Sequence, residues 1–266
     1  MIIGVVNMVG VLTTTVASVA SSNTNSVSPN PSSEVSVAAQ RNETLRQGLP
    51  GRRIGGGTRG DRIFASTYAY LTALVTSDNV NITTAAQPTL LFYVPEMTAS
   101  NEAEFVLRDA NDELVYASTL QLEPAGGIVS IETAESLGTP EMAMNENYRW
   151  YFSIVPDATD RSKDIVVHGA IRRVDPSEWL AANGVDPALQ SQLSSLAPLE
   201  KAKVLYQQAN MWHEAAVILD QLRQADPKNT EIVAEWTQLL DSAGIATIAQ
   251  TEPSLNESSE NVLGSL

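Results

Sequence analysis

Residues 104–117 read EFVLRDANDELVYA. Apolar and polar residues alternate on both sides of Ala110-Asn111-Asp112, and a period of two is typical of strands with one buried face. Asn and Asp tolerate the left-handed backbone conformation that tight turns require. The segment therefore predicts an antiparallel β-hairpin.

The same pattern extends in both directions from this hairpin. Tyr148-Arg149-Trp150-Tyr151-Phe152 places aromatic side chains on both faces, which favours a central strand. Short strands separated by turns, with no long helix between them, predict an antiparallel immunoglobulin-like sandwich over residues 63–175. The expected strands are 70–76, 89–94, 104–109, 114–122, 127–132, 149–155 and 165–174.

Residues 176–248 predict a helical tail, so the expected fold class is α+β. Asp175-Pro176 and Asp186-Pro187 are helix starts, and Gly244 is a helix stop. Tyr206, Ala215 and Pro227 have the spacing of one tetratricopeptide-type helical hairpin. A single unit of this kind packs on its own domain or on a partner, and Tyr206 and Trp212 are the candidate contact residues.

The first 62 residues predict a leader and a linker. Residues 1–20 resemble a signal peptide, with Ser18-Val19-Ala20 as a cleavage site, although no Lys or Arg precedes the apolar run. A misassigned start, a truncated leader and a cytoplasmic terminus remain alternatives. Residues 21–62 are rich in Ser, Asn and Pro, then in Arg and Gly, which predicts a disordered linker. Disorder is also expected over 249–266.

Arginines gather just before the predicted sandwich. Six of them face only two acids in residues 41–62, whereas residues 63–160 hold two arginines and fourteen acids. A basic arm for an anionic surface and a linker lying on the chain's own acidic body both fit this contrast. The candidate interaction residues are Arg52, Arg53, Arg59 and Arg62.

Composition narrows the function classes. A net charge of −15 argues against a nucleic-acid binder, because phosphate affinity comes from Lys and Arg. The absence of cysteine removes disulfides, thiolate nucleophiles and Cys-based zinc sites, and two histidines (His168 and His213) are too few for a multi-histidine metal centre. Asp109–Glu113 and Asp157–Asp164 fit turns better than calcium loops. We expect no catalytic residue, metal, cofactor or transmembrane segment.

Five runs together resemble a known family. They are LTALV (71–75), QPTLLFYVP (87–95), EFVLRD (104–109), YRWYF (148–152) and VHGAIRRV (167–174). They are similar, over about residues 50–245, to the domain-of-unknown-function family number 928, found mainly in cyanobacteria. The resemblance implies an exported or envelope protein and supplies no catalytic residues. A Trp near Ala170 and often a Cys near Pro156 would match the family better.

Two functions from different classes follow. The favoured hypothesis is an exported or envelope-associated, non-catalytic interaction or structural module, whose unknown protein partner binds the helical tail. The alternative is a hydrolase of a cell-wall glycan or another polymer, using two carboxylates that face each other across a groove. The sequence leaves the partner, the oligomeric state and the final compartment (periplasmic or extracellular) open.

Overall fold

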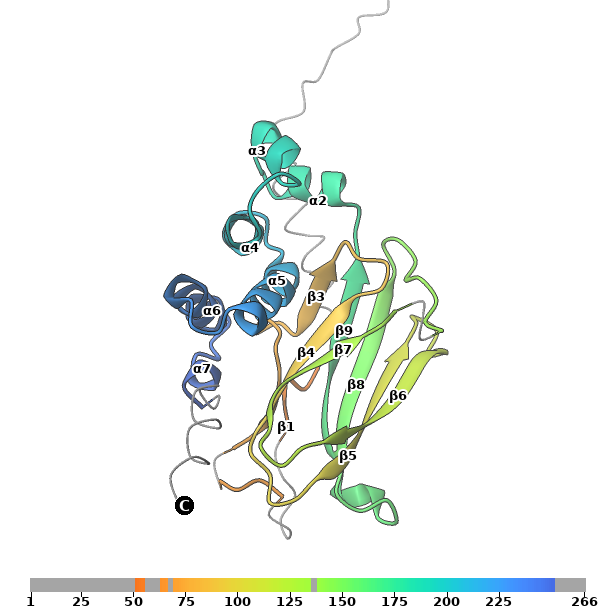
Figure 1. The fold of residues 1–266 in the computed structure, drawn as a ribbon. Coiled ribbons are helices and arrows are strands. Elements are labelled where there is room, and N and C mark those ends of the chain that lie inside the picture. The colour runs from red at the N-terminus through yellow and green to blue at the C-terminus, as the bar shows by residue number, and fades with distance from the viewer. Residues whose placement is uncertain (1–50, 56–62, 67–68, 135–137, 252–266) are drawn as a thin grey trace, which may run out of the picture.

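The computed structural model describes residues 51–55, 63–66, 69–134 and 138–251. The predicted leader, most of the predicted linker, Arg59 and Arg62 lie outside these residues. Within them the fold is α+β, as predicted: strands come first and helices follow (Figure 1).

The strands form two sheets, which we call the covered sheet and the open sheet. The covered sheet has the order β1-β2-β4-β7 and the open sheet has the order β3-β9-β8-β5-β6. The strands of the covered sheet are β1 (Ile54–Gly55), β2 (Leu71–Ala73), β4 (Thr89–Val94) and β7 (Gly127–Glu132). Those of the open sheet are β3 (Val80–Thr83), β5 (Asn101–Arg108), β6 (Leu114–Leu122), β8 (Asn147–Val155) and β9 (Ile165–Arg173).

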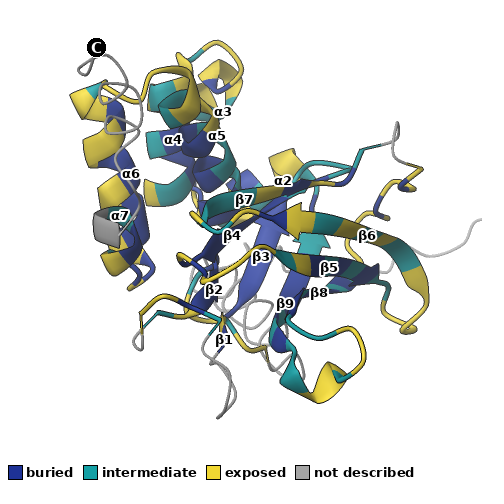
Figure 2. Ribbon diagram, turned by 60° about the horizontal axis from the view of Figure 1, so that its bottom comes forward, coloured by how far each residue is buried: buried dark blue, intermediate teal, exposed yellow. Residues whose placement is uncertain are grey.

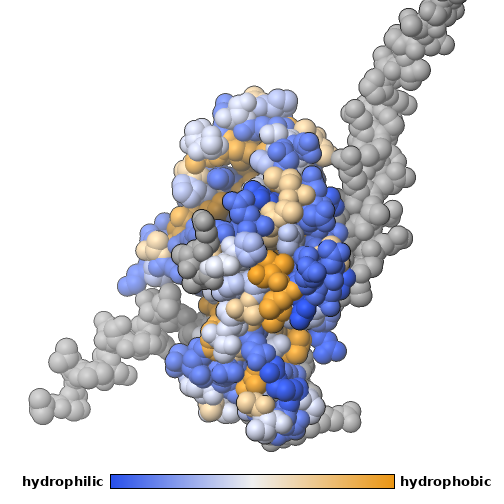
Figure 3. Space-filling model, turned by 90° about the vertical axis from the view of Figure 1, so that its right-hand side faces the viewer, coloured by the Kyte–Doolittle hydropathy of each residue, from blue (hydrophilic) through white to orange (hydrophobic). Residues whose placement is uncertain are grey.

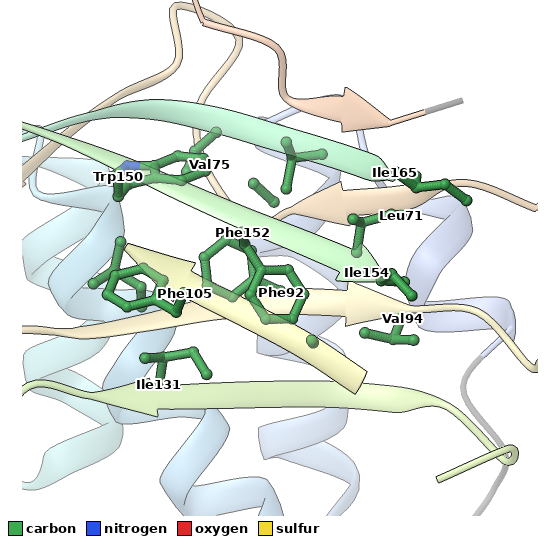
Figure 4. Packing of buried hydrophobic residues seen from close by; sticks show 14 of the residues in the cluster. Leu71, Val75, Phe92, Val94, Phe105, Ile131, Trp150, Phe152, Ile154 and Ile165 are labelled. Atoms are coloured by element: carbon green, nitrogen blue, oxygen red, sulfur yellow. The ribbon is translucent and has the colours of Figure 1, made fainter. Parts of the chain in front are cut away.

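The inner faces of the two sheets pack on an aromatic core (Figure 4). Phe92 of β4 stacks on Phe152 of β8 with ring centroids 4.3 Å apart, and Trp150 meets Phe92 edge-on at 5.5 Å. Trp150 also requires glycine at position 169 of the neighbouring strand β9, because a Cβ there would lie 2.4 Å from the indole Cζ2. The core thus joins strands that are far apart in the sequence.

Helices cover the outer face of the covered sheet. Leu91 and Tyr93 of β4 point away from the aromatic core and are buried, with Leu74, in a second cluster made mostly of helix residues. Figure 2 shows that α4, α5 and α6 turn their buried sides inward and their exposed sides to solvent. The helices are α2 (Pro176–Ala182), α3 (Pro187–Gln192), α4 (Pro198–Gln207), α5 (Trp212–Ala225), α6 (Thr230–Ser242) and α7 (Thr247–Thr251).

Local sequence explains where the helices start. Asp175 accepts a hydrogen bond from the Glu178 backbone N–H at the start of α2, and Asp186 accepts one from Ala188 at the start of α3. A proline follows each capping Asp, where its missing N–H costs nothing. Asn229 caps α6 in the same way.

Polar contacts fasten α5 to both sheets. The Glu214 carboxylate accepts hydrogen bonds from the Thr83 hydroxyl at 2.8 Å and from the Thr84 backbone N–H at 2.6 Å. Buried Asp220 accepts one from the Ser130 hydroxyl of β7 at 3.2 Å and pairs with Arg223 at 2.7 Å. These contacts set the position of α5 over β3, β4 and β7.

Among the described residues, helices contact the open sheet at its β3–β9 edge, where Trp179 of α2 packs on Val80, Ile82 and Ala170, and no helix layer covers β5, β6 and β8. Along β5, buried Ala103, Phe105 and Leu107 alternate with half-buried Glu104 and Val106. The side of the molecule away from the helices is mainly hydrophilic, with a small hydrophobic group near its middle (Figure 3). The predicted alternation is therefore confirmed along β5 as one buried and one open face, whereas residues 114–117 of β6 are half-buried or exposed.

The structure corrects the strand prediction at the sheet edges. The sequence missed β1, which pairs with β2, and β3, which pairs with β9 in parallel, so the open sheet is mixed rather than wholly antiparallel. Both are too short for periodicity to reveal, and β3 is buried at all four positions because α5 lies against it. At the other end, α7 continues to Thr251, into the segment expected to be disordered.

Candidate functional site

A pocket lies between the outer face of the covered sheet and α7, and we call it the sheet–helix groove. Its volume is about 670 Å³. Buried Tyr93, Ile245 and Ile248 line its interior, and exposed Ile54 and Tyr70 lie at its rim. Ile54 is 51% exposed and Tyr70 is 45% exposed, which is high for large apolar side chains. The groove is therefore an open, apolar concavity.

The end of α6 shapes one wall of the groove. Gly244 has a φ of 69°, a left-handed value that glycine adopts without steric cost. Its N–H bonds the carbonyl of Asp241, and the N–H of Ile245 bonds the carbonyl of Leu240. These two bonds form a Schellman motif, which reverses the chain. The reversal brings Ile245 and Ile248 against the cluster that contains Tyr93.

Charge is sparse in the groove. Glu96, which is exposed, is the one ionisable carboxylate among the described residues that line it. Acid–base hydrolysis of a glycosidic bond uses two carboxyl groups across the substrate. The groove is thus better suited to apolar contact than to proton transfer.

The acidic loop between β8 and β9 forms internal ion pairs. Lys163 Nζ lies 2.9 Å from Asp157 and 3.7 Å from Asp160, and Arg161 bridges Asp164 and Glu104. Hydrogen bonds from Lys163 and Thr159 lower the pKa of Asp157. Within the described part of the chain, no three His, Asp or Glu residues are grouped to hold a metal ion.

Of the arginines predicted as a patch, Arg52 and Arg53 lie within the described residues, and both are next to the sheets. Arg52 is exposed and pairs with His168 through the backbone, with N···O distances of 2.9 and 3.0 Å. Arg53 is half-buried, and burial lowers its pKa. Segment 51–55, expected to be linker, therefore lies against both sheets, since Arg52 meets β9 and Ile54 meets β2.

The two aromatic residues predicted for the interaction surface lie among the helices. Half-buried Tyr206 donates a hydrogen bond to Glu235 of α6. Trp212 is only 7% exposed, and its indole N–H reaches the Leu239 carbonyl and the Ser242 hydroxyl at 3.1 Å each. Both side chains hold α6 against its neighbours, so little of Trp212 is left for a partner.

Sequence reasoning missed the groove itself. Its walls come from β1, the segment before β2, the end of β4 and α7, which only the fold brings together. The signal in the sequence that could have pointed to the groove was the unbroken apolar run of β4, because such a run predicts a strand covered on both faces.

Comparison with known proteins gives one relationship. No curated protein matches the chain. None of the helices within the described residues is long and apolar enough to cross a membrane. Residues 54–253, which include both sheets and all the described helices, match the family described as Domain of Unknown Function (DUF928), and the chain belongs to that family.

Proposed function

We propose that this protein is an exported, non-catalytic binding module whose sheet–helix groove holds an apolar segment of a partner polypeptide. The observation that carries the proposal is the exposure of Ile54 and Tyr70 beside an apolar concavity of about 670 Å³. Apolar side chains that close over such a pocket gain free energy by leaving water. The helical tail contributes Ile245 and Ile248, so the partner contacts tail and sheet together.

Non-catalytic binding fits the chemistry of the groove better than hydrolysis does. Glu96 has no second carboxylate beside it among the described lining residues. The carboxylates between β8 and β9 are engaged by Arg161 and Lys163. A glycan hydrolase would need a pair of acids that faces its substrate.

Two finer features of the fold belong to this proposal. We expect the sheets to be related to immunoglobulin-like sandwiches, supported by their shared aromatic core. We expect α4 and α5 to correspond to one tetratricopeptide-type hairpin, supported by the complete burial of Ala215 where the helices meet. Both types of unit often serve in recognition, although fold alone does not fix function.

Binding can be tested with short, fluorescein-labelled peptides of graded apolar content and fluorescence anisotropy. We expect apolar peptides to bind and polar peptides of equal length not to bind. Replacing both rim side chains (Ile54→Ser with Tyr70→Ser) should weaken binding about tenfold or more, because aromatic and aliphatic anchors dominate such contacts.

Val233→Ser is the matched control. Val233 is 45% exposed on α6 and is not among the groove residues. Equal binding by the rim variant, the control variant and the unmodified chain would rule out the groove.

Export is tested separately by the intact mass of the natively expressed protein in each cell fraction. A mature N-terminus near Ser21 in the periplasm or medium is expected. Recovery of the chain with Met1 in the cytoplasm would contradict export and leave the binding proposal untouched.

A further inference from the structure

The open sheet ends at β6 in an edge strand with one free side. β6 has nine residues, and within the described part of the chain its backbone pairs with β5 and with no other strand (Figure 1). A ladder on one side of a strand uses only the N–H and C=O groups that point to that side. The groups on the other side of β6 are therefore open to a further strand.

β6 lacks the features that usually protect such an edge. Exposed edge strands are commonly short, or they carry charged residues or proline, which discourage pairing with another chain. The other three edge strands fit this rule: β1 has two residues, β3 has four and lies against α5, and β7 ends in Glu132. By contrast, LVYASTLQL of β6 contains no charged residue, proline or glycine. A long, neutral edge favours pairing with a strand from another chain.

A bulge limits the part of β6 that can pair. The register between β5 and β6 shifts at Leu107 and Arg108, so that Arg108 pairs with Leu114 and Val115 is skipped. A bulge bends the strand and interrupts its ladder locally. The regular part of the edge is therefore residues 116–122.

The side chains of this regular part form two rows. Tyr116, Leu120 and Leu122 pack on the aromatic core, and the Tyr116 ring lies 6.2 Å from that of Phe105. The opposite row is exposed and consists of Ala117, Thr119 and Gln121. Tyr116 and Leu120 are only half-buried, because among the described residues no further strand lies beside them. The core of the two sheets is thus incompletely covered at this edge.

The apolar row of β6 is complementary to itself. In an antiparallel pair of two copies centred on Thr119, each Tyr116 faces Leu122 of the other copy and each Ser118 faces Leu120. Because side chains alternate along a strand, this register keeps the apolar rows of both copies on the core side. Pairing would cover Tyr116 and Leu120, and the removal of their apolar surface from water favours it.

The exposed row and the ends of the strand also suit a second copy. Thr119 faces itself on the two-fold axis, and Thr–Thr pairs are favourable across antiparallel strands. The acids that flank β6 avoid each other, because Glu113 faces Ala125 and Glu123 faces Val115 in this register. No like charges therefore meet along the pair, although the net charge of the chain is −15.

We infer that this protein forms a symmetric dimer in which the β6 strands of two copies pair antiparallel about Thr119 and join the two open sheets into one. A two-fold axis closes the assembly at two chains. An interface limited to one strand pair is small, so the dimer should be in equilibrium with single chains. The sheet–helix groove lies on the other sheet, so the inference does not depend on the proposed binding of a partner there.

Sedimentation velocity of the full chain, at concentrations from about 1 µM to about 1 mM, tests the dimer. We expect the mean mass to rise with concentration from that of one chain to that of two, and no further. Thr119→Lys places two ammonium groups next to each other on the axis and should weaken association about tenfold or more. Thr119 is exposed, so the fold, followed by circular dichroism, should be unchanged. Thr237→Lys, at an exposed position of α6, is the matched control and should associate as the unmodified chain does.

Mixing two variants tests the register itself. Thr119→Glu alone should associate as weakly as Thr119→Lys, because two carboxylates then meet on the axis. An equimolar mixture of the two variants should associate at least about tenfold more strongly than either alone, since Lys and Glu then face each other. A mixture that associates no better than its components, or equal association by Thr119→Lys and the unmodified chain, would overturn the inference. An unmodified chain that stays single over the whole range would also overturn it and would leave β6 to a strand of another protein.

Discussion

The two sheets share one core but differ in what lies on their outer faces. On the covered sheet, Leu91 and Tyr93 are buried under the helices. On the open sheet, Glu104 and Val106 remain half-exposed. The difference is visible in the sequence: LLFYV (residues 90–94) of β4 is apolar without a break, whereas EFVLR of β5 alternates. An unbroken apolar strand needs a second layer, and the sheet–helix groove lies where that layer meets the covered sheet.

Truncation on each outer face gives the largest expected contrast. Leu91→Ala should lower the free energy of unfolding by about 2–5 kcal/mol, because it leaves a cavity under the helices. Val106→Ala, on the half-exposed face, should cost about 1 kcal/mol or less. Urea unfolding followed by circular dichroism measures both. Equal losses would mean that the helices do not seal the covered sheet.

Removing an ion-paired carboxylate from each face should give a second contrast in stability between the two sheets. Asp220 is 2% exposed and holds Arg223 and Ser130. Asp220→Ala should cost about 3 kcal/mol, because it leaves the Arg223 charge without this carboxylate. Glu104→Ala on the open sheet removes one of the two carboxylates that pair with exposed Arg161 and should change the urea midpoint little. A larger loss for Glu104→Ala would reverse the assignment of the two faces.

The two histidines should respond differently to acid. The pKa of His213 is lowered by burial, so between that pKa and about 6.5 the unfolded chain binds a proton that the folded chain does not. Stability should therefore fall as the pH drops below about 6.5, by up to about 1.4 kcal/mol per pH unit. His213→Gln should flatten this slope in urea unfolding between neutral and acidic pH.

His168 is the internal control for that slope. It lies half-buried on the open sheet, stacks on Tyr151 at 5.7 Å, and its pKa is lowered by partial burial and by Arg52. His168→Gln should flatten the slope less than His213→Gln does, because His168 loses less of its hydration on folding. The opposite ranking would show that the buried histidine is hydrated.

Much of this fold follows from local sequence. The hairpin at residues 104–117, the aromatic strand β8 and the Asp-Pro helix starts each have a short-range cause that periodicity or capping reveals. What could not be predicted depends on contacts distant in sequence. Val80–Thr83 is a strand because β9 and α5 lie beside it, and its four residues carry no usable period.

The sites were harder to predict than the fold for the same reason. Ile54, Tyr93 and Ile248 meet in the groove although nearly two hundred residues separate the first from the last. Asn81 of β3 and His213 of α5 likewise line one smaller pocket, although they are far apart in the sequence. Trp212 shows this limit of prediction from sequence. It was expected on an interaction surface, but it is buried and its indole N–H hydrogen-bonds the Leu239 carbonyl, which fixes α6 to α5.

The most direct test of the central claim is to map which face a ligand contacts, by following backbone amide NMR signals while an apolar peptide is titrated into the full chain. The account predicts shifts confined to the groove, at Ile54, Tyr70 and Ile245, with Val106 and Tyr151 of the open sheet unchanged. Shifts centred on Val106 and Tyr151, or none anywhere, would contradict it.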